Sequence, residues 1–116
     1  MRDHEHLNRL AIVPLPAEID MANAEDVGAQ LRAAFAPGVT VVIADLGSTV
    51  FCGTSGARQL VLAHKRAAAS NRELRVVISS ARVLRVLAIL GLDRELEIYP
   101  DLAAALGTDG QGYAPG

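Results

Sequence analysis

Cysteine and aromatic residues, which often stabilise small folds, are scarce in this chain. Among its 116 residues are one cysteine, no tryptophan, two phenylalanines and two tyrosines. The single thiol, Cys52, excludes an intrachain disulfide and a cysteine-based metal site, and it is expected to be a small buried hydrophobe in a reducing compartment. Hydrophobic residues still make up 51% of the chain, so aliphatic side chains must build its core. A chain of 116 residues is long enough for one domain with a hydrophobic core and too short for two ordinary domains.

An excess of positive charge is also missing. The formal net charge is -2, so we expect no basic surface for nucleic acid or an anionic membrane. Charged residues interrupt every apolar stretch before the roughly 18 to 20 residues that a membrane span needs. The start, MRDHEH, lacks the apolar segment of a signal peptide. The expectation is a cytoplasmic protein, without direct contact to nucleic acid or membrane, that is a monomer or a weak homodimer.

Apolar, often β-branched runs alternate with segments of helical periodicity. Strands are predicted over 10–15, 39–44, 74–79 and 96–99, and helices over 23–36, 55–69, 80–91 and 102–106. Such alternation favours right-handed crossovers and a mostly parallel sheet covered by helices. The predicted fold class is α/β, with four or five strands and about four helices in one domain over 8–106. A flexible N-terminus (1–7) and a disordered C-terminal tail (107–116) complete the predicted organisation.

Several boundary residues carry local signals. Pro14 removes a donor from the first strand, which favours the edge of a sheet. Asn23, followed by two acidic residues, is predicted to cap the first helix, and Ser80 the third. In the second helix, His64 and Ala68 are expected on the face that packs on the sheet.

Gly53, Thr54, Ser55 and Gly56 fall where a strand turns into a helix. Free amides at a helix N-terminus attract phosphate, so one hydroxyl could carry a phosphate there, but a plain cap by Thr54 or Ser55 is the commoner arrangement. The spacing alone leaves both readings open. A nucleophile elbow would read G-x-S-x-G with a base and an acid, and a P-loop would read G-x-x-x-x-G-K-[ST]. Neither is present, so we expect no enzyme.

Other polar residues give weaker signals. His4, Glu5 and His6 are too few to close a metal site, so neither a metal nor a cofactor is expected. Asp20 and Asp45 fall near strand ends, where open α/β sheets gather functional groups, although capping of a turn explains them equally well.

Four stretches together resemble a STAS domain, the fold of bacterial anti-sigma factor antagonists, from about Leu10 to Leu106. They are PAEIDMANAEDV at 16–27, VVIADLGSTVFCGTSGARQL at 41–60, LRVVISSARVLRVLAILGLD at 74–93 and ELEIYPDLAAAL at 95–106. The first resembles the family's G-E-[IL]-D turn. The second resembles its D-S-S-G-[LV] segment.

The resemblance implies a non-catalytic regulator of transcription that acts by partner switching. In the family, an anti-sigma factor with serine/threonine kinase activity uses Mg-ATP to phosphorylate the hydroxyl after the motif's Asp. Here that hydroxyl belongs to Thr54, with Ser55 as the second choice. The unmodified antagonist binds the kinase and frees its sigma factor, and the phosphorylated form lets go. The partner-binding residues implied are Asp20, Gly53, Thr54, Ser55, Gly56 and Arg58.

Two positions depart from the family pattern. Gly53 stands in place of the motif's Asp, so a carboxylate that could orient the hydroxyl or contact the partner is missing. Ala17 stands where the family usually has Gly. The alternative that follows is a constitutive STAS adaptor, in a signalling assembly or a lipid transporter, that is not phosphorylated.

Overall fold

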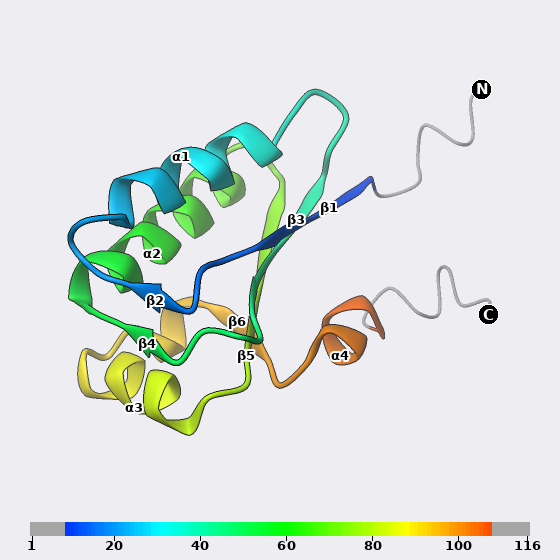
Figure 1. The fold of residues 1–116 in the computed structure, drawn as a ribbon. Coiled ribbons are helices and arrows are strands. Elements are labelled where there is room, and N and C mark those ends of the chain that lie inside the picture. The colour runs from blue at the N-terminus through cyan, green and yellow to red at the C-terminus, as the bar shows by residue number, and fades with distance from the viewer. Residues whose placement is uncertain (1–8, 108–116) are drawn as a thin grey trace.

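The computed structural model describes residues 9–107 of the chain, and Figure 1 shows their arrangement. The N-terminus predicted to be flexible and the histidines at positions 4 and 6 lie outside the described residues. So does the predicted C-terminal tail from residue 108 onward. Gly107, predicted to begin that tail, is instead the last residue of a helix.

Strands and helices alternate in the described part, as the sequence predicts. The elements are β1 (Leu10–Pro14), β2 (Glu18–Ile19), α1 (Ala24–Ala34), β3 (Val41–Leu46), β4 (Phe51–Cys52), α2 (Thr54–Ala69), β5 (Glu73–Ile78), α3 (Ala81–Ile89), the 3-10 helix η2 (Asp93–Glu95), β6 (Glu97–Tyr99) and α4 (Leu102–Gly107). The α/β class and the four helices are confirmed. Two short strands and the 3-10 helix were not predicted.

Parallel pairing organises both sheets of the described region. The main sheet has the order β1-β3-β5-β6, and β2 pairs with β4 in a separate ladder. Strand β1 lies at an edge, where the missing N–H of Pro14 costs no ladder bond. Strand β3 lies inside the sheet, and its run Val41–Ala44 is at most 2% exposed. Burial on both faces explains why this run is apolar without alternation.

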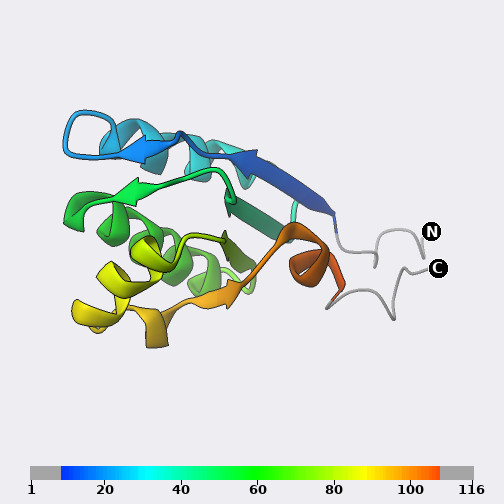
Figure 2. The same cartoon turned by 60° about the horizontal axis from the view of Figure 1, so that its bottom comes forward.

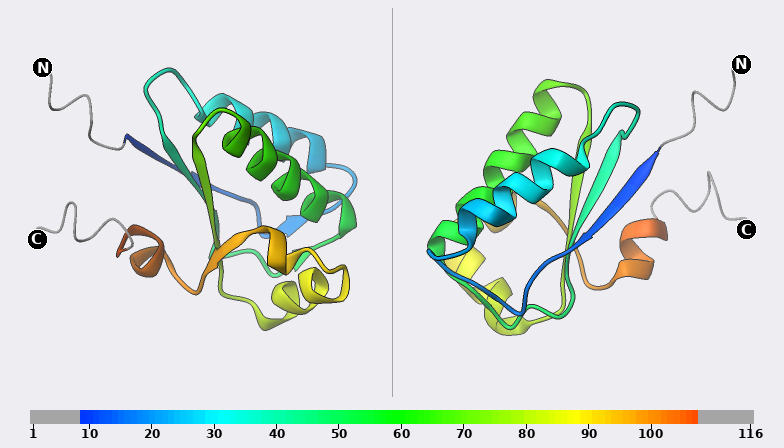
Figure 3. Two further views of the ribbon diagram at one scale, coloured as in Figure 1. Left: turned by 180° about the vertical axis from the view of Figure 1, so that it is seen from behind. Right: turned by 45° about the horizontal axis from the view of Figure 1, so that its top comes forward.

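Helices cover the two faces of the main sheet unequally (Figures 1 and 3). Helices α1 and α2 pack on one face, where Leu31 and Leu60 are fully buried in the larger core. The short helix α4 packs on the other face, where Ala105 meets Val41 and Ile43. Figure 2 shows the strands extending from the described ends of the chain toward α2 and α3, so the loops after β1 and β3 come together at the far end.

Some local predictions fail for identifiable reasons. Asn23 occupies the N-cap position of α1, but its side chain does not cap the helix. Its Oδ1 accepts from the Asp20 N–H at 2.9 Å and its Nδ2 donates to the Glu18 carbonyl at 2.8 Å, so it braces the preceding loop. Ser80 does cap α3, accepting from the Val83 N–H at 3.2 Å. Ala68 is exposed, because α2 buries Ala67 instead.

A buried arginine fastens α4 to the sheet. Arg75, on β5, is 3% exposed, and its Nη1 donates to the Ala105 carbonyl at 2.9 Å. Its Nε donates to the Glu73 carboxylate at 2.9 Å, so the buried charge is paired. Glu97 on the neighbouring strand lies against this group. Burial, and then hydrogen bonding and repulsion from Glu73, raise the pKa of Glu97 above its ordinary value of 4.5.

Replacing Glu97 by Gln tests this arrangement. Because the pKa of Glu97 is higher in the folded state than in the unfolded chain, the folded state binds this proton more tightly. The protonated Glu97 therefore contributes its full stabilisation below the pKa of the unfolded chain. That contribution is lost as the pH rises through the pKa of the folded state. Glu97→Gln should therefore raise the free energy of unfolding near pH 7 by about a few tenths of a kcal/mol, the size expected at an exposed site. Urea unfolding should show that the gain disappears below about pH 4. A loss of stability at neutral pH would contradict the assignment.

Candidate functional site

The short ladder of β2 and β4 builds the site. Glu18 is opposite Phe51, and Ile19 is opposite Cys52. Beyond the ladder, the Val50 N–H donates to the Ala17 carbonyl at 2.8 Å and the Gly53 N–H to the Ile19 carbonyl at 2.9 Å. The loop after β2 and the start of α2 are thereby held side by side. Strands of two residues show no periodicity, so sequence patterns could not reveal this pairing.

Thr49 supports the same ladder from beneath. It is 1% exposed, and its hydroxyl donates to the Pro16 carbonyl at 2.8 Å across 33 residues of sequence. Its N–H donates to the Leu46 carbonyl at 3.0 Å, which turns the chain after β3. Thr49 could not be recognised from the sequence, because one threonine in a predicted loop belongs to no pattern.

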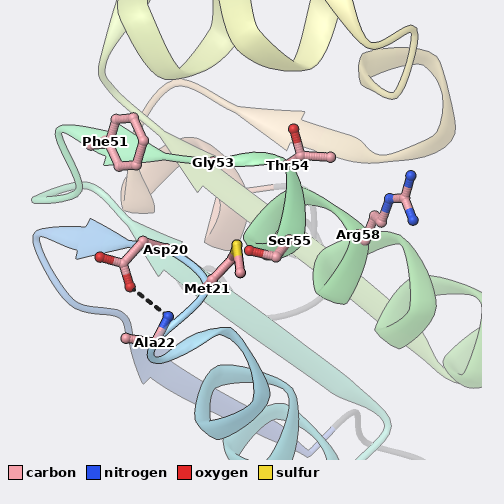
Figure 4. A pocket seen from close by; sticks show the side chains of 8 residues that line it. All are labelled: Asp20, Met21, Ala22, Phe51, Gly53, Thr54, Ser55 and Arg58. Carbon is pink, nitrogen blue, oxygen red and sulfur yellow. Dashed lines mark hydrogen bonds between the residues drawn. The ribbon is translucent and has the colours of Figure 1, made fainter.

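Helix α2 begins one residue earlier than predicted, which changes the role of its hydroxyls. Gly53 is the N-cap residue and Thr54 the first helical residue, and no side chain caps the helix. The reading of Thr54 or Ser55 as a cap is therefore wrong. The Thr54 side chain is exposed, whereas Ser55 is half-buried. In Figure 4 the Ser55 hydroxyl is turned toward Met21, whereas Thr54 projects away from Asp20.

Gly56 has a packing role rather than a contact role. It is buried in the first turn of α2. A Cβ at this position would lie 2.5 Å from Cγ2 of Ile19 and 2.9 Å from Sγ of Cys52. The absent side chain therefore lets α2 approach the β2–β4 ladder closely. Gly56 shapes the predicted site from below and does not form its surface.

Cys52 is a buried structural thiol, as the sequence predicts. It is 2% exposed, and burial raises its pKa to about 11. The thiolate is the reactive form of cysteine, so this residue is inert near neutral pH.

A pocket of about 640 Å³ opens at this end of the molecule (Figure 4). It is lined by Asp20, Met21, Ala22, Phe51, Gly53, Thr54, Ser55 and Arg58. Five of the six predicted partner-binding residues thus come together, although Asp20 is separated from the others by more than thirty residues of sequence. One carboxylate and one guanidinium face a surface that is otherwise mostly apolar or hydroxylic.

Two exposed hydrophobic side chains at this pocket were missed from the sequence. Met21 is 85% exposed and Phe51 is 44% exposed. Phe51 is one of only four aromatic residues in the chain. That scarcity is the weak signal by which the sequence could have pointed to Phe51. Large apolar side chains that gather on a surface mark contacts with other molecules.

The remaining candidate residues lie elsewhere. The Asp45 carboxylate accepts from the Gly47 N–H at 2.8 Å, so Asp45 follows its turn-capping reading and does not line the pocket. His64 lies further along α2, and its Nδ1 is buried without a hydrogen-bond partner in the described region. Within residues 9–107 there is no cluster of three or more metal-binding side chains. Over the same range no helix combines the length and the apolar character that crossing a membrane requires.

Comparisons with known proteins agree with this geometry. The STAS domain family model matches residues 2–105, and the chain belongs to that family. None of the curated proteins matches the sequence.

Solved structures give the same fold. An anti-sigma factor antagonist from Mycobacterium paratuberculosis superposes with a TM-score of 0.77 at 25% identity, over 85% of this chain and 84% of that one. The unphosphorylated anti-sigma factor antagonist SpoIIAA has a TM-score of 0.71 at 20% identity, over 90% and 92%. A sulfate transporter family protein from Wolinella succinogenes has a TM-score of 0.76 at 14% identity, over 88% and 85%. The fold therefore serves both antagonists and a transporter family protein.

Two glycine substitutions test how closely α2 must approach the ladder. Gly56→Ala should lower the free energy of unfolding by about 1 to 3 kcal/mol, the usual cost of overpacking, because its Cβ meets buried atoms on both strands. Gly28, buried in α1, is the matched control, since its Cβ would meet only the ends of the flexible Gln59 and Arg32 side chains. Gly28→Ala should be neutral or gain up to about 1 kcal/mol from helix propensity. Equal effects in urea unfolding would refute the packing role.

Proposed function

We propose that this chain is a non-catalytic anti-sigma factor antagonist with Thr54 as its phosphorylation site. The observation that carries the proposal is the exposed Thr54 hydroxyl at the rim of a pocket that also presents apolar side chains for a partner. The likeness to the Mycobacterium paratuberculosis antagonist supports it. The partner would be an anti-sigma factor with serine/threonine kinase activity, in the cytoplasm, and its capture would free a sigma factor for transcription.

Phosphoryl transfer requires only an acceptor hydroxyl from this chain. The kinase brings Mg-ATP, and the Thr54 Oγ1 attacks the γ-phosphorus. A bond forms between Oγ1 and phosphorus while the bond from phosphorus to the β–γ bridging oxygen breaks, and ADP leaves. The hydroxyl proton passes to a base on the kinase. An accessible hydroxyl on a fixed backbone meets this requirement, and Thr54 meets it better than the half-buried Ser55.

Phosphorylation would then weaken the contact through charge. A phosphate adds about 1.5 to 2 negative charges, and it does so beside Met21 and Phe51, whose contact with a partner depends on excluding water. Asp20 lies across the same pocket and adds like charge. About 1.4 kcal/mol changes affinity tenfold, so a modest repulsion suffices for release.

Gly53 sets the rate of this switch. Its backbone is extended, with φ -81° and ψ -178°, and a Cβ there would make ordinary contact with the Phe51 ring at 3.6 Å. The site can therefore hold the family's Asp without strain. Gly53→Asp should speed phosphorylation of Thr54 by the cognate kinase several-fold, because a carboxylate would orient the hydroxyl. Initial rates of phosphate incorporation from radiolabelled ATP measure the effect. An unchanged or slower rate in Gly53→Asp would contradict the prediction, because it would show that the missing carboxylate does not slow phosphorylation of Thr54.

A constitutive STAS adaptor is the second candidate. Two observations favour it: the motif carboxylate is absent at Gly53, and the Wolinella succinogenes transporter family protein shares the fold. Such an adaptor would bind its partner whether or not Thr54 carried a charge.

Partner capture by three forms of the full chain separates the two functions. We expect wild type and Thr54→Ala to retain an anti-sigma factor from the native cell extract, and Thr54→Glu to retain at least tenfold less, because charge at the pocket repels the partner. Ala68→Glu is the matched control, because it adds the same charge at an exposed position of α2 outside the pocket, and it should leave capture unchanged. Equal capture by wild type and Thr54→Glu would favour the adaptor.

A further inference from the structure

Arg58 lies one helical turn after Thr54 on α2. The two residues are four apart in sequence, which places their Cβ atoms about 5 to 6 Å apart on one face of the helix. Both are exposed and both line the pocket. In Figure 4 both side chains project from α2 on the side away from Asp20.

The guanidinium of Arg58 has no other engagement in the described region. It makes no hydrogen bond or ion pair with another described residue, whereas Nη1 of Arg72 donates to the Phe35 carbonyl at 3.0 Å and Lys65 pairs with Glu95 at 3.9 Å. Arg58 is thus the one cation of the pocket lining and is available for a new contact there.

The pocket charges are balanced until a phosphate arrives. Asp20 and Arg58 are its two ionisable lining residues, of opposite sign. Gly53 adds no charge, although the corresponding position of the STAS family motif is an Asp. An aspartate at this position would give the pocket lining a net negative charge, and its absence leaves the lining neutral before a phosphate is added.

We propose that a phosphate on Thr54 pairs with Arg58, so that a single modification both adds negative charge to the pocket and withdraws the cation that the pocket offers to a partner. This regulation rests on the proposed function only in requiring that Thr54 be modified.

The physical chemistry of the pair favours it. The planar guanidinium matches phosphate oxygens with two parallel hydrogen bonds, and such charge-assisted bonds are stronger than neutral ones. An acidic group four residues before a basic one is also the favourable order along a helix. A partner carboxylate that had paired with Arg58 in the unmodified complex would then lose its counter-ion.

The test uses the full chain with phosphothreonine inserted at position 54 during synthesis, so it needs neither the kinase nor the partner. Phosphorus NMR follows the second ionisation of the phosphate, whose pKa is about 6 when unperturbed. An Arg58 pair stabilises the dianion, so Arg58→Gln should raise this pKa by about 0.3 unit relative to the unsubstituted phosphoprotein. Asp20→Asn should move it in the opposite direction, by less.

Arg66→Gln is the matched control. It removes the same charge from an exposed position of the same helix, about 12 Å further along the axis, which exceeds the Debye length of about 8 Å at physiological salt. It should leave the phosphate pKa unchanged. Equal pKa values with and without Arg58 would overturn the pairing, and so would equal shifts in the two arginine variants. Neither result bears on whether a kinase modifies Thr54, which incubation with the kinase and Mg-ATP decides separately.

Discussion

The backbone hydrogen bonds between β2 and β4 are the constraint on which the site depends. Two paired residues on each strand, extended by the bonds from Val50 to Ala17 and from Gly53 to Ile19, hold the loop after β2 against the start of α2. Without this ladder Asp20 and Thr54 would not line one pocket, because the two belong to separate crossovers. The ladder lies at one end of the main sheet, where the loops after β1 and β3 meet (Figure 1).

Close packing makes that ladder firm. Gly56 lets α2 come within contact of Ile19 and Cys52, and the buried Thr49 hydroxyl ties the loop after β3 to Pro16. The backbone under the pocket is therefore fixed from three directions. The exposed side chains above it, Thr54 among them, can change charge without the fold having to change. A rigid base beneath an exposed hydroxyl suits the phosphorylation switch that we propose, because modification would change the charge of the surface and not the fold.

Much of the fold follows from sequence pattern, but the site follows only in part. The β-branched runs of β3 and β5 and the cap at Ser80 carry strong local signals, and the resemblance to STAS motifs implies one partner-binding surface for Asp20 and Thr54. The β2–β4 ladder carries no such signal, since two residues cannot show a period. The exposure of Met21 and Phe51 at the pocket was not predicted for another reason. Hydrophobic residues are by default expected to be buried in the core.

The helix start shows why boundaries are hard to predict. Thr54 and Ser55 both suit an N-cap, and propensity alone cannot say that Gly53 takes that place. The choice is tertiary: the Gly53 N–H is already bound to the Ile19 carbonyl, so the helix begins after it. The same shift by one residue makes the Thr54 hydroxyl a surface group instead of a cap.

The proposed switch depends on the transfer of a phosphate to Thr54. Incubation of the full chain with its cognate anti-sigma factor kinase and Mg-ATP, followed by peptide mass spectrometry, tests it most directly. We expect one phosphate per chain, on Thr54, and none in the Thr54→Ala variant. An unmodified chain, under conditions in which the same kinase phosphorylates another antagonist, would contradict it, as would a phosphate on any other residue.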